Sequence, residues 1–336
     1  MEPTGGIVRA RWALFAAFVL GGLLSGVLAA APATERFTAP LSHGMFSPLG
    51  FYLSLSDREP EQSIIAGKRR VNILVMGLDR RPVEDPSALS RTDSVMVLTL
   101  DTQRQTGGIL SIPRDLLVPI PISPETLVHD RVNNIYAYGE QFGYLGGGPG
   151  LAKAMIAYNF GVPIDYYVLL DFHGFERMID AIGGIDVRLS SPLLDPSYPT
   201  GNYGTMRVSI GAGLQHLNGE RALWYARSRY QSSDFSRLER QRQVVMAARQ
   251  KLLQLDMLPK LPGLWAIAQE TVITDLTLSD VMDLAKLAWG ISDEKITARS
   301  LDLDYVSHGM WQGDPFVLLP DRSKIGNVVR ELFYDP

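Results

Sequence analysis

Arginine is concentrated in one short stretch of the chain, between residues 221 and 242. Six arginines and no lysine occur there, in the sequence RALWYARSRYQSSDFSRLERQR. Because a planar guanidinium can hold a carboxylate or phosphate through two parallel hydrogen bonds, this preference for arginine is typical of anion binding. The alternative is an exposed helix with acidic partners, but the stretch itself offers only Asp234 and Glu239. The composition therefore favours a site for an anion, above all phosphate.

Three further segments place charged residues beside short apolar runs that we predict to be buried strands. They are GLDRR at 77–81, RTDS at 91–94 and SIPRD at 111–115. Ligands of α/β proteins bind in loops at the ends of strands, so we predict that these segments are loops and contribute to a site. Their candidate site residues are Asp79, Arg91, Asp93 and Arg114.

Acids and bases in this set complement one another chemically. Asp79 and Asp93 offer the oxygen ligands that suit Mg²⁺, which is held in proteins by one or two carboxylates together with substrate phosphates. Phosphoryl transfer uses this combination, because positioning and electrostatic stabilisation supply most of its catalysis. Structural salt bridges among the same side chains are an alternative that the sequence leaves open. The arginines that would neutralise the remaining phosphate charge are Arg91, Arg114, Arg227 and Arg229.

Strands and helices alternate along the chain from residue 71 onward, which predicts an α/β fold with a layered α-β-α sheet. The apolar runs predict strands at 71–76, 94–100, 108–112, 166–170, 185–189, 296–303 and 316–319. Composition and periodicity predict helices at 134–142, 150–160, 172–182, 218–229, 237–255, 259–269 and 278–289, and a last one from 322. No proline-rich linker interrupts this part, so we predict one domain spanning 71–336.

An apolar stretch near the N-terminus is long enough to cross a bilayer. Residues 12–31 contain Ser25 as their only polar side chain, and Arg9 and Arg11 precede them. About 20 apolar residues match the bilayer core, and the arginines predict a cytoplasmic N-terminus with an extracytoplasmic main domain. A cleavable signal peptide is the rival, but its apolar region is usually about 7–15 residues. We therefore predict a cytoplasmic segment at 1–11, a signal-anchor at 12–31 and a juxtamembrane linker at 32–70.

Overall composition excludes several classes of function. The net charge is −4, so the protein lacks the general basic field of a nucleic-acid-binding domain, and we predict no nucleic-acid partner. The chain has no cysteine, which excludes disulfides, thiolate metal sites and a cysteine nucleophile. The arginine-rich stretch is therefore a local feature of an acidic protein, and this suits a small anionic ligand.

Several motifs occur in a characteristic order behind the apolar stretch. They are RTDS (91–94), SIPRD (111–115), RVNNIYAYGE (131–140), DFHGFERMIDAIGGIDV (171–187), and LNGERALWYARSR followed by DFSRLERQRQ (within 217–243). Together they resemble the LytR-CpsA-Psr family of bacterial envelope proteins. The resemblance covers about residues 71–255 and extends more loosely to the C-terminus.

The resemblance implies a membrane-anchored phosphotransferase that moves a glycopolymer from a polyprenyl-diphosphate carrier onto a cell-wall glycan such as peptidoglycan. By motif, Asp79 and Asp93 match the carboxylates that hold Mg²⁺. Arg131 is a departure, because the family commonly has lysine there, and a point cation becomes a planar fork. The residues that match the diphosphate contacts are Arg91, Arg114, Arg227 and Arg229, with Arg237 and Gln241 as further polar contacts. The remaining arginines of the rich stretch, Arg221, Arg240 and Arg242, are expected to be solvated.

A polyprenyl carrier also requires an apolar groove, which we expect between helices and sheet. Ordinary core packing is the alternative for each residue that could line it. Two other functions stay open at this point: hydrolysis of the lipid diphosphate, with water as acceptor, and a non-catalytic lipid-binding or regulatory role. The groove candidates are Ile135, Tyr136, Tyr138, Met155, Tyr158, Phe172, Phe175 and Met178.

Overall fold

A six-stranded sheet forms the centre of the molecule. The computed structural model describes residues 68–80, 90–230, 234–252 and 267–334. The order of strands across the sheet is β11-β6-β1-β2-β3-β12. Its members are β1 (Arg70–Asp79), β2 (Arg91–Asp101), β3 (Thr106–Ile112), β6 (Tyr166–Leu170), β11 (Val272–Thr274) and β12 (Ile296–Ser300).

The directions of the strands bring the ends of four of them to the same side of the sheet. β1 and β6 are parallel, whereas β2 is antiparallel to both β1 and β3. The carboxyl ends of β1, β3 and β6 therefore lie beside the amino end of β2. This edge holds the segments that the sequence singled out by their charges.

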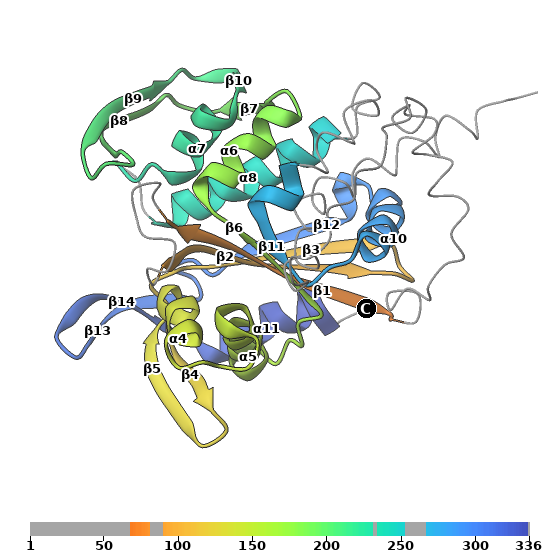
Figure 1. Ribbon diagram of the computed structural model, residues 1–336, viewed down its shortest axis with the longest axis vertical. Helices are drawn as coiled ribbons and strands as arrows, with labels where there is room; N and C mark the ends of the chain where they lie inside the picture. Colours follow the sequence, from red (N-terminus) through yellow and green to blue (C-terminus); the bar gives the residue numbers. More distant parts are fainter. Residues whose placement is uncertain (1–67, 81–89, 231–233, 253–266, 335–336) are drawn as a thin grey trace, which may run out of the picture.

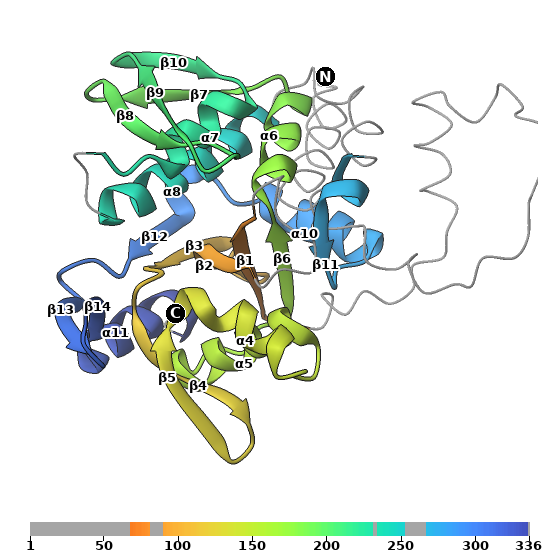
Figure 2. The ribbon, with the colours of Figure 1, turned by 60° about the vertical axis from the view of Figure 1, so that its left-hand side comes forward.

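Helices cover both faces of the sheet and give three layers (Figures 1 and 2). One face carries α6 (Phe172–Ala181), α7 (Gly219–Arg227), α8 (Asp234–Leu252) and α10 (Leu278–Trp289). The other carries α4 (Ile135–Gln141), α5 (Gly147–Phe160) and α11 (Arg322–Val329). Strand side chains alternate between the layers, so Leu74 and Met76 pack with α4 and α5, while Ile73 packs towards α10. The predicted α-β-α architecture is confirmed.

Four two-stranded units surround these layers. They are β4 (Leu117–Ser123) with β5 (Thr126–Arg131), β7 (Ile185–Leu189) with β10 (Gly213–Leu217), β8 (Leu193–Pro199) with β9 (Thr205–Ile210), and β13 (Val306–Trp311) with β14 (Asp314–Pro320). Short helical turns are η3 (Val132–Asn134), η5 (Asp293–Lys295) and η6 (Arg330–Tyr334). In Figure 1 the β4–β5 and β13–β14 hairpins lie on the same side of the sheet as α4, α5 and α11.

The strand ends differ from the sequence-based prediction. β1 continues to Asp79 and β2 already begins at Arg91, so Asp79 and the segment 91–94 belong to strands and not to loops. The reason is that the two strands keep pairing up to this edge, with Asp79 opposite Arg91. Pro113, Arg114 and Asp115 do follow the end of β3, as predicted.

Several predictions concern chain segments that lie wholly or partly outside the described residues. The cytoplasmic segment at 1–11 and the signal-anchor at 12–31 lie outside them entirely, and so do residues 32–67 of the juxtamembrane linker. Of the helix predicted at 237–255, residues 253–255 lie outside them. Of the helix predicted at 259–269, residues 259–266 lie outside them, and 267–271 are helical. Within the described ranges, no helix combines the length and apolar character needed to cross a bilayer.

Candidate active site

A β-bulge in β2 sets the geometry of the charged edge. Gly77 pairs with Ser94 and Leu78 pairs with Thr92, so Asp93 is an extra residue between two consecutive pairs. Such a bulge interrupts the alternation of side chains. The Thr92 hydroxyl consequently donates to the carbonyl of Asn133 beneath the sheet (3.2 Å), whereas Ser94 faces α8 on the opposite side. Asp93 is left at the edge between the two layers.

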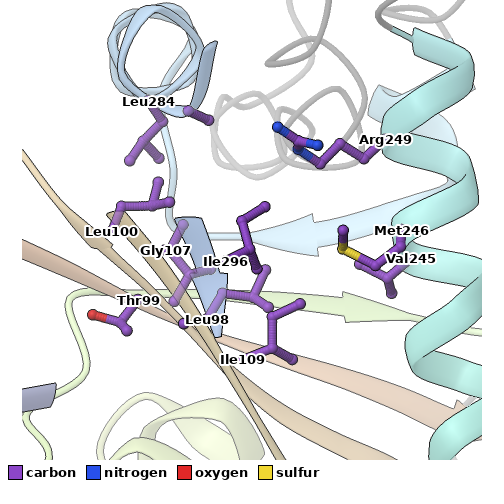
Figure 3. A pocket seen from close by; sticks show the side chains of 13 residues that line it. Leu98, Thr99, Leu100, Gly107, Ile109, Val245, Met246, Arg249, Leu284 and Ile296 are labelled. Carbon is purple, nitrogen blue, oxygen red and sulfur yellow. The ribbon is translucent and has the colours of Figure 1, made fainter. Parts of the chain in front are cut away.

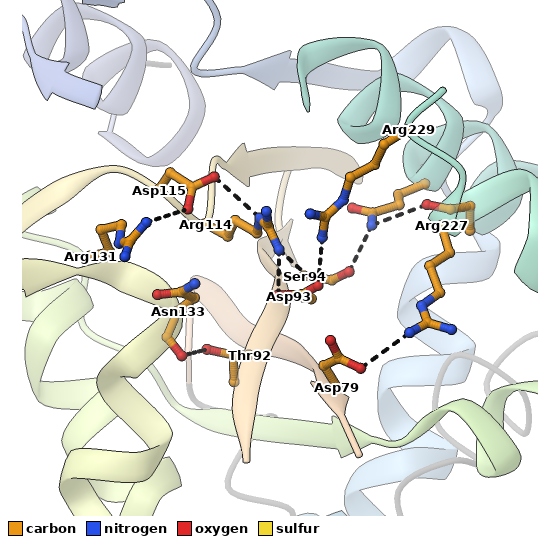
Figure 4. A network of polar contacts seen from close by, with 12 residues as sticks. Asp79, Thr92, Asp93, Ser94, Arg114, Asp115, Arg131, Asn133, Arg227 and Arg229 are labelled. Atoms are coloured by element: carbon orange, nitrogen blue, oxygen red, sulfur yellow. Dashed lines mark hydrogen bonds and ion pairs between the residues drawn. The ribbon is translucent and has the colours of Figure 1, made fainter. Parts of the chain in front are cut away.

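Asp93 is the acceptor on which two arginines converge (Figure 4). Arg114 Nη1 lies 2.9 and 3.0 Å from its two carboxylate oxygens, and Arg229 Nη2 lies 2.8 Å from Oδ2. Burial alone raises the pKa of the Asp93 carboxyl, but Arg114, Arg229 and Arg237 outweigh burial and hold the pKa below its usual value. Asp93 is therefore an anion at neutral pH, held between cations from opposite layers.

A second ion pair stands beside the first. Arg227 Nη2 lies 3.4 Å from Asp79 Oδ1, and Arg227 Nη1 donates to the carbonyl of Pro199 at 3.3 Å. The guanidinium also lies over the ring of Phe172, 4.1 Å from its centroid, in a cation–π contact. These contacts, shown in part in Figure 4, hold Arg227 over the carboxyl ends of β1 and β6.

A buried framework orients the turn that carries Arg227 and Arg229. Ser228 between them is fully buried, and its hydroxyl donates to Asp195 at 2.7 Å. Arg240 is 9% exposed and donates to the carbonyls of Tyr225 (2.8 Å) and Ser228. The expectation that Arg240 is solvated is wrong, because α8 directs this side chain against the end of α7.

The other two arginines expected to be solvated are partly exposed and make local contacts. Arg242 pairs with Glu239 one turn earlier in α8, and Arg221 donates to the carbonyl of His216 at 3.3 Å. Neither reaches the charged edge through a contact described here. The expectation of solvent contact therefore agrees with the structure for Arg221 and Arg242 and is wrong for Arg240.

Arg237 and Gln241 lie one helical turn apart on α8 and face the sheet. Arg237 is 2% exposed and Gln241 is 9% exposed, and both line a cavity that also reaches Asp93. Gln241 Nε2 donates to Ser94 Oγ at 2.8 Å and to the carbonyl of Ala226 at 3.4 Å. In this structure Gln241 thus ties α8 to β2 and to the end of α7.

Arg131 and Arg91 lie farther from Asp93. Arg131 Nη1 is 3.7 Å from Asp115, whose carboxylate also accepts a hydrogen bond from Arg114 Nε at 3.2 Å. Arg131 is therefore linked to the centre through Asp115, a residue to which the sequence analysis gave no role. Arg91 is exposed at the first position of β2, opposite Asp79. Its assignment to the site stays a prediction.

An apolar cavity begins at this charged edge and runs between the sheet and helices α6, α7 and α8. The empty space within it is about 800 Å³, a volume that includes open solvent at its mouth. Asp93, Arg227, Arg237 and Gln241 line one part of it, and the rest is largely apolar. Those apolar residues are Val75, Met76, Met96, Leu170, Phe172, Phe175, Leu223, Ala226, Val244 and Val245.

A second apolar cavity continues along the same sheet face (Figure 3). It shares Val245 with the first and lies beneath α8 and α10, with Arg249 among its lining residues. Of the residues predicted to form a groove, Phe172 and Phe175 line the first cavity. Ile135, Tyr136 and Met155 are instead core residues under the opposite face, and Tyr138 packs against that core. Their prediction as groove residues is wrong, because helical apolar residues alone do not indicate which layer a helix joins.

The carboxylates fit the requirements of a Mg²⁺ ion that shares its ligands with a substrate. Asp93 is ionised, and Asp79 stands at the same edge of the sheet. Among the described residues no group of three or more His, Cys, Asp or Glu side chains gathers as a complete metal cage. Mg²⁺ is usually held in proteins by one or two carboxylates together with substrate phosphates, so Asp79 and Asp93 are the residues at this edge that could hold it.

Comparison with known proteins places the chain in a family. The LytR_cpsA_psr family model matches residues 53–332, which is most of the sequence. The chain belongs to the LytR-CpsA-Psr family. The motifs at Arg91–Ser94, Ser111–Asp115 and Leu217–Gln243 all fall within the matched region.

Related sequences include a protein named as a transferase and one named as a regulator. The polyisoprenyl-teichoic acid–peptidoglycan teichoic acid transferase TagV of Bacillus subtilis (strain 168) is 30% identical over 236 residues, covering 70% of this chain and 57% of that protein. The regulatory protein MsrR of Staphylococcus aureus (strain COL) is 31% identical over 229 residues, covering 67% of this chain and 62% of that protein. The matched part of this chain thus spans about three fifths of the length of each of these relatives.

Solved structures of the family share the fold. The crystal structure of B. subtilis TagV matches with a TM-score of 0.62 and 28% identity, covering 80% of this chain and 99% of that one. The structure of TagT bound to LIIa-WTA matches with a TM-score of 0.59 and 25% identity, covering 79% of this chain and 90% of that one. The mixed α/β architecture is therefore the architecture of the family.

Proposed function

We propose that this protein is a membrane-anchored phosphotransferase that moves a glycopolymer from a polyprenyl-diphosphate carrier onto a cell-wall glycan such as peptidoglycan. The observation that carries the proposal is the convergence of Arg114 and Arg229 on Asp93 at the mouth of an apolar cavity. A diphosphate joined to a long hydrocarbon needs both features side by side. The name of the related TagV describes a transfer of this kind.

The prenyl chain of the carrier lies in the cavity between the sheet and α6, α7 and α8. Phe172 and Phe175 stand near its charged end, and Val245 joins it to the second cavity. Burying hydrocarbon here gains about 25 cal/mol per Å² of apolar surface removed from water. The lipid therefore binds mainly through the hydrophobic effect, and its diphosphate is held at the edge of the sheet.

The arginines then hold the diphosphate by exchanging partners. Arg114, Arg227 and Arg229 already stand at the edge, each paired with Asp93 or Asp79. A phosphate oxygen forms charge-assisted hydrogen bonds with these guanidinium groups without reorganising the backbone. Asp79 and Asp93 would hold Mg²⁺ against the diphosphate, where the ion would neutralise charge that develops on the phosphate oxygens.

The transfer forms one P–O bond and breaks another. The acceptor hydroxyl oxygen bonds to the phosphorus that bears the glycan, the bond from that phosphorus to the lipid phosphate oxygen breaks, and the hydroxyl proton is released. Lipid monophosphate leaves with the electron pair of the broken bond. Because Arg114, Arg229 and Arg237 lower the pKa of Asp93, this carboxylate is a weak base at neutral pH. Asp93 is therefore assigned to organising charge and not to removing the proton.

The N-terminal segment gives the enzyme its place in the cell. The apolar residues 12–31, which lie outside the described residues, anchor the chain with its main domain on the extracytoplasmic side. Both substrates are found there: the carrier lipid in the membrane and the acceptor glycan in the wall.

The proposal is tested with the full-length protein in detergent, a lipid-linked oligosaccharide and a wall-glycan acceptor, following the phosphodiester product by mass spectrometry. Asp93→Ala and Arg229→Ala should each reduce the transfer rate by about 10²–10³-fold, as loss of one electrostatic contact to the transition state does. Arg242→Ala is the matched control, because its partner Glu239 lies on the same helix away from the edge. Product formation unchanged by the first two substitutions would overturn the site, and release of lipid monophosphate without acceptor would indicate hydrolysis instead.

A further inference from the structure

A bulge in β8 turns a tyrosine toward Arg227. Asp195 pairs with Val208 and Tyr198 pairs with Met206, so β8 advances three residues where β9 advances two. An extra residue of this kind shifts the alternation of side chains along a strand. Asp195 and Tyr198 are consequently both buried, with 4% and 3% of their surfaces exposed. Without the bulge, the tyrosine would face the opposite side of β8 from Asp195.

The guanidinium of Arg227 lies over two aromatic rings. Its central carbon is 4.1 Å from the centroid of the Phe172 ring and 5.7 Å from the centroid of the Tyr198 ring. Both distances lie within the range of about 6 Å in which a cation is attracted to the face of an aromatic ring. The Tyr198 ring also makes a T-shaped contact with Trp224, with 6.5 Å between the ring centroids. Because Trp224 and Arg227 are three residues apart in α7, they face the same side of that helix and both meet Tyr198.

β8 contacts the turn after α7 at two further points. Asp195 accepts a hydrogen bond from the Ser228 hydroxyl at 2.7 Å, and the carbonyl of Pro199 accepts one from Arg227 Nη1 at 3.3 Å. The strand therefore presents a carboxylate, an aromatic ring and a carbonyl to two consecutive residues of the turn. These contacts fix the direction in which the Arg227 side chain points.

The contact with the rings differs from the ion pair with Asp79 in what a bound diphosphate would do to it. Asp79 accepts from Arg227 Nη2 at 3.4 Å, and a phosphate oxygen that binds this group takes the place of the carboxylate. An aromatic face attracts the guanidinium through its π electrons and carries no net charge, so an incoming anion does not have to displace it. The rings therefore keep their hold on Arg227 after the ion pair has been exchanged.

Tyr198 is neutral in this setting. Burial raises the pKa of its phenol to about 12, although the positive charge of Arg227 acts in the opposite direction. A phenolate would compete with phosphate for the guanidinium as a second anion. The neutral ring does not compete, and it leaves the charge of Arg227 available to a ligand.

We propose that Tyr198 is a positioning residue for the transfer reaction: together with Phe172, its ring holds Arg227 toward the diphosphate once Asp79 has given up its ion pair. This inference rests on the proposed function, in which Arg227 contacts the diphosphate. Tyr198 acts only through Arg227 and does not itself touch the reacting atoms.

The test is a double-mutant cycle on the full-length protein, with transfer measured at saturating donor and acceptor. Tyr198→Leu should lower kcat about ten-fold, which is the loss expected from one partly buried cation–π contact. Tyr198→Phe keeps the ring and should stay within about two-fold of the wild type. In an Arg227→Gln background, Tyr198→Leu should add less than about a two-fold loss, because the cation it orients is gone.

The matched control is Tyr166→Leu. Tyr166 is 6% exposed, so its replacement removes a comparable buried ring, and its hydroxyl donates to Asp280 of α10 at 3.0 Å. None of its contacts among the described residues involves Arg227. This variant should therefore lower stability without lowering kcat at a temperature where it is folded.

A second measurement changes the electrons of the ring and leaves its shape nearly constant. Phenylalanine and analogues with increasing numbers of ring fluorine atoms are introduced at position 198. Fluorine withdraws π electrons from the ring face and weakens its attraction for a cation, so kcat should fall stepwise along the series. The same series at position 166 should give equal rates. These replacements keep the packing and test the proposal even where Tyr198→Leu fails to fold.

The outcomes separate this inference from the proposed function. If the wild type transfers glycan, an equal loss from Tyr198→Leu in both backgrounds, or a flat fluorine series, would overturn the positioning role and leave the function standing. If the wild type shows no transfer, the function fails, and calorimetric binding of farnesyl diphosphate to the same variants decides the inference. A loss of affinity that depends on Arg227 supports it. Additive losses, or no binding by the wild type, reject it.

Discussion

Asp93 keeps several guanidinium groups together before any substrate arrives. Arg114 and Arg229 donate to it directly, and Arg237 contributes to lowering its pKa. Like charges gathered at one edge would otherwise repel one another and destabilise the fold. The carboxylate thus stands where the diphosphate is proposed to bind, and its removal has consequences for stability as well as for turnover.

The depressed pKa of Asp93 predicts how its contribution to stability depends on pH. Unfolding restores the pKa to about 3.9, so near that pH and below it the unfolded state binds more protons than the native state. The contribution is therefore complete well above pH 4 and is lost as the pH falls through the native pKa. Urea unfolding should show wild type more stable than Asp93→Asn at pH 6, with the difference shrinking below pH 4. A difference that is constant across this range would contradict the assignment.

Arg240 should matter for stability because it donates to backbone carbonyls at the end of α7. Arg240→Ala leaves the carbonyls of Tyr225 and Ser228 without their buried donor. Hydrogen bonds to charged groups contribute about 1.5–3 kcal/mol, so we expect a loss of about 2–3 kcal/mol in the free energy of unfolding, measured by urea titration. Arg242→Ala, which removes a partly exposed pair, should change stability by less than about 1 kcal/mol.

At this scale the sequence predicted residue types better than contacts. The excess of arginine and the two aspartates predicted an anion site, because side-chain chemistry is visible in sequence. The roles of Asp195 and Arg240 are not, since each depends on a partner whose position only the fold determines. Asp115 was within a motif, and its position next to Arg114 was the one signal that pointed to it.

At the scale of elements, close packing of helices fixes where the arginines stand. Gly219 begins α7, and a Cβ added there would lie 2.2 Å from the carbonyl oxygen of Glu176 in α6. Only glycine allows α7 to approach α6 so closely, and α7 ends at Arg227. The position of the Arg227–Arg229 turn therefore depends on a residue far from the charged edge.

Gly219→Ala should destabilise the protein and displace α7. Backbone atoms must move to relieve the contact, so we expect a loss of about 1–3 kcal/mol, the usual cost of overpacking, and a lower transfer rate. Gly326→Ala in α11 is the matched control, because nothing lies within 4 Å of its Cβ position. It should be neutral or stabilise by up to about 1 kcal/mol, since alanine is the better helix former. The midpoint of thermal unfolding, measured for both variants and the wild type, tests these two predictions.

The elements predicted from sequence were those with a strong hydrophobic pattern. β6, β7 and α10 have the predicted bounds. The β4–β5 hairpin was missed because Pro119 and Pro121 argue against a strand, and such prolines are tolerated only at a sheet edge. β8 contains two prolines in the same way, and β11 is only three residues long. No propensity pattern marks the bulge at Asp93, since it is a property of strand pairing.

At the scale of the whole molecule, the two apolar cavities lie end to end on one face of the sheet. Val245 of α8 is the lining residue they share. A long prenyl chain that starts at the charged edge would therefore pass this residue to reach the second cavity. This face could not be told from the other by sequence, because helices cover both.

Val245→Trp should obstruct the passage between the cavities. We expect affinity for a long polyprenyl diphosphate to fall by about ten-fold or more, while that for a diphosphate with one or two isoprene units changes little, because a short chain ends before Val245. Calorimetry with both lipids measures the difference. Gln250→Trp, on the exposed side of α8, is the control for adding a large side chain. Equal loss for both lipids would indicate a general disturbance of the fold.

The two arginines that bind Asp93 come from distant parts of the chain: Arg114 is 21 residues away and Arg229 is 136 residues away. Arg114 follows the end of β3, and Arg229 follows α7. The full set of contacts with Asp93 therefore exists only when the ends of the strands and the helical layer that contains α7 are both in place. A fragment that lacks either part cannot form the full set of contacts. Heat inactivation should therefore follow the same curve as loss of tertiary structure, which makes enzymatic turnover a direct probe of cooperative folding.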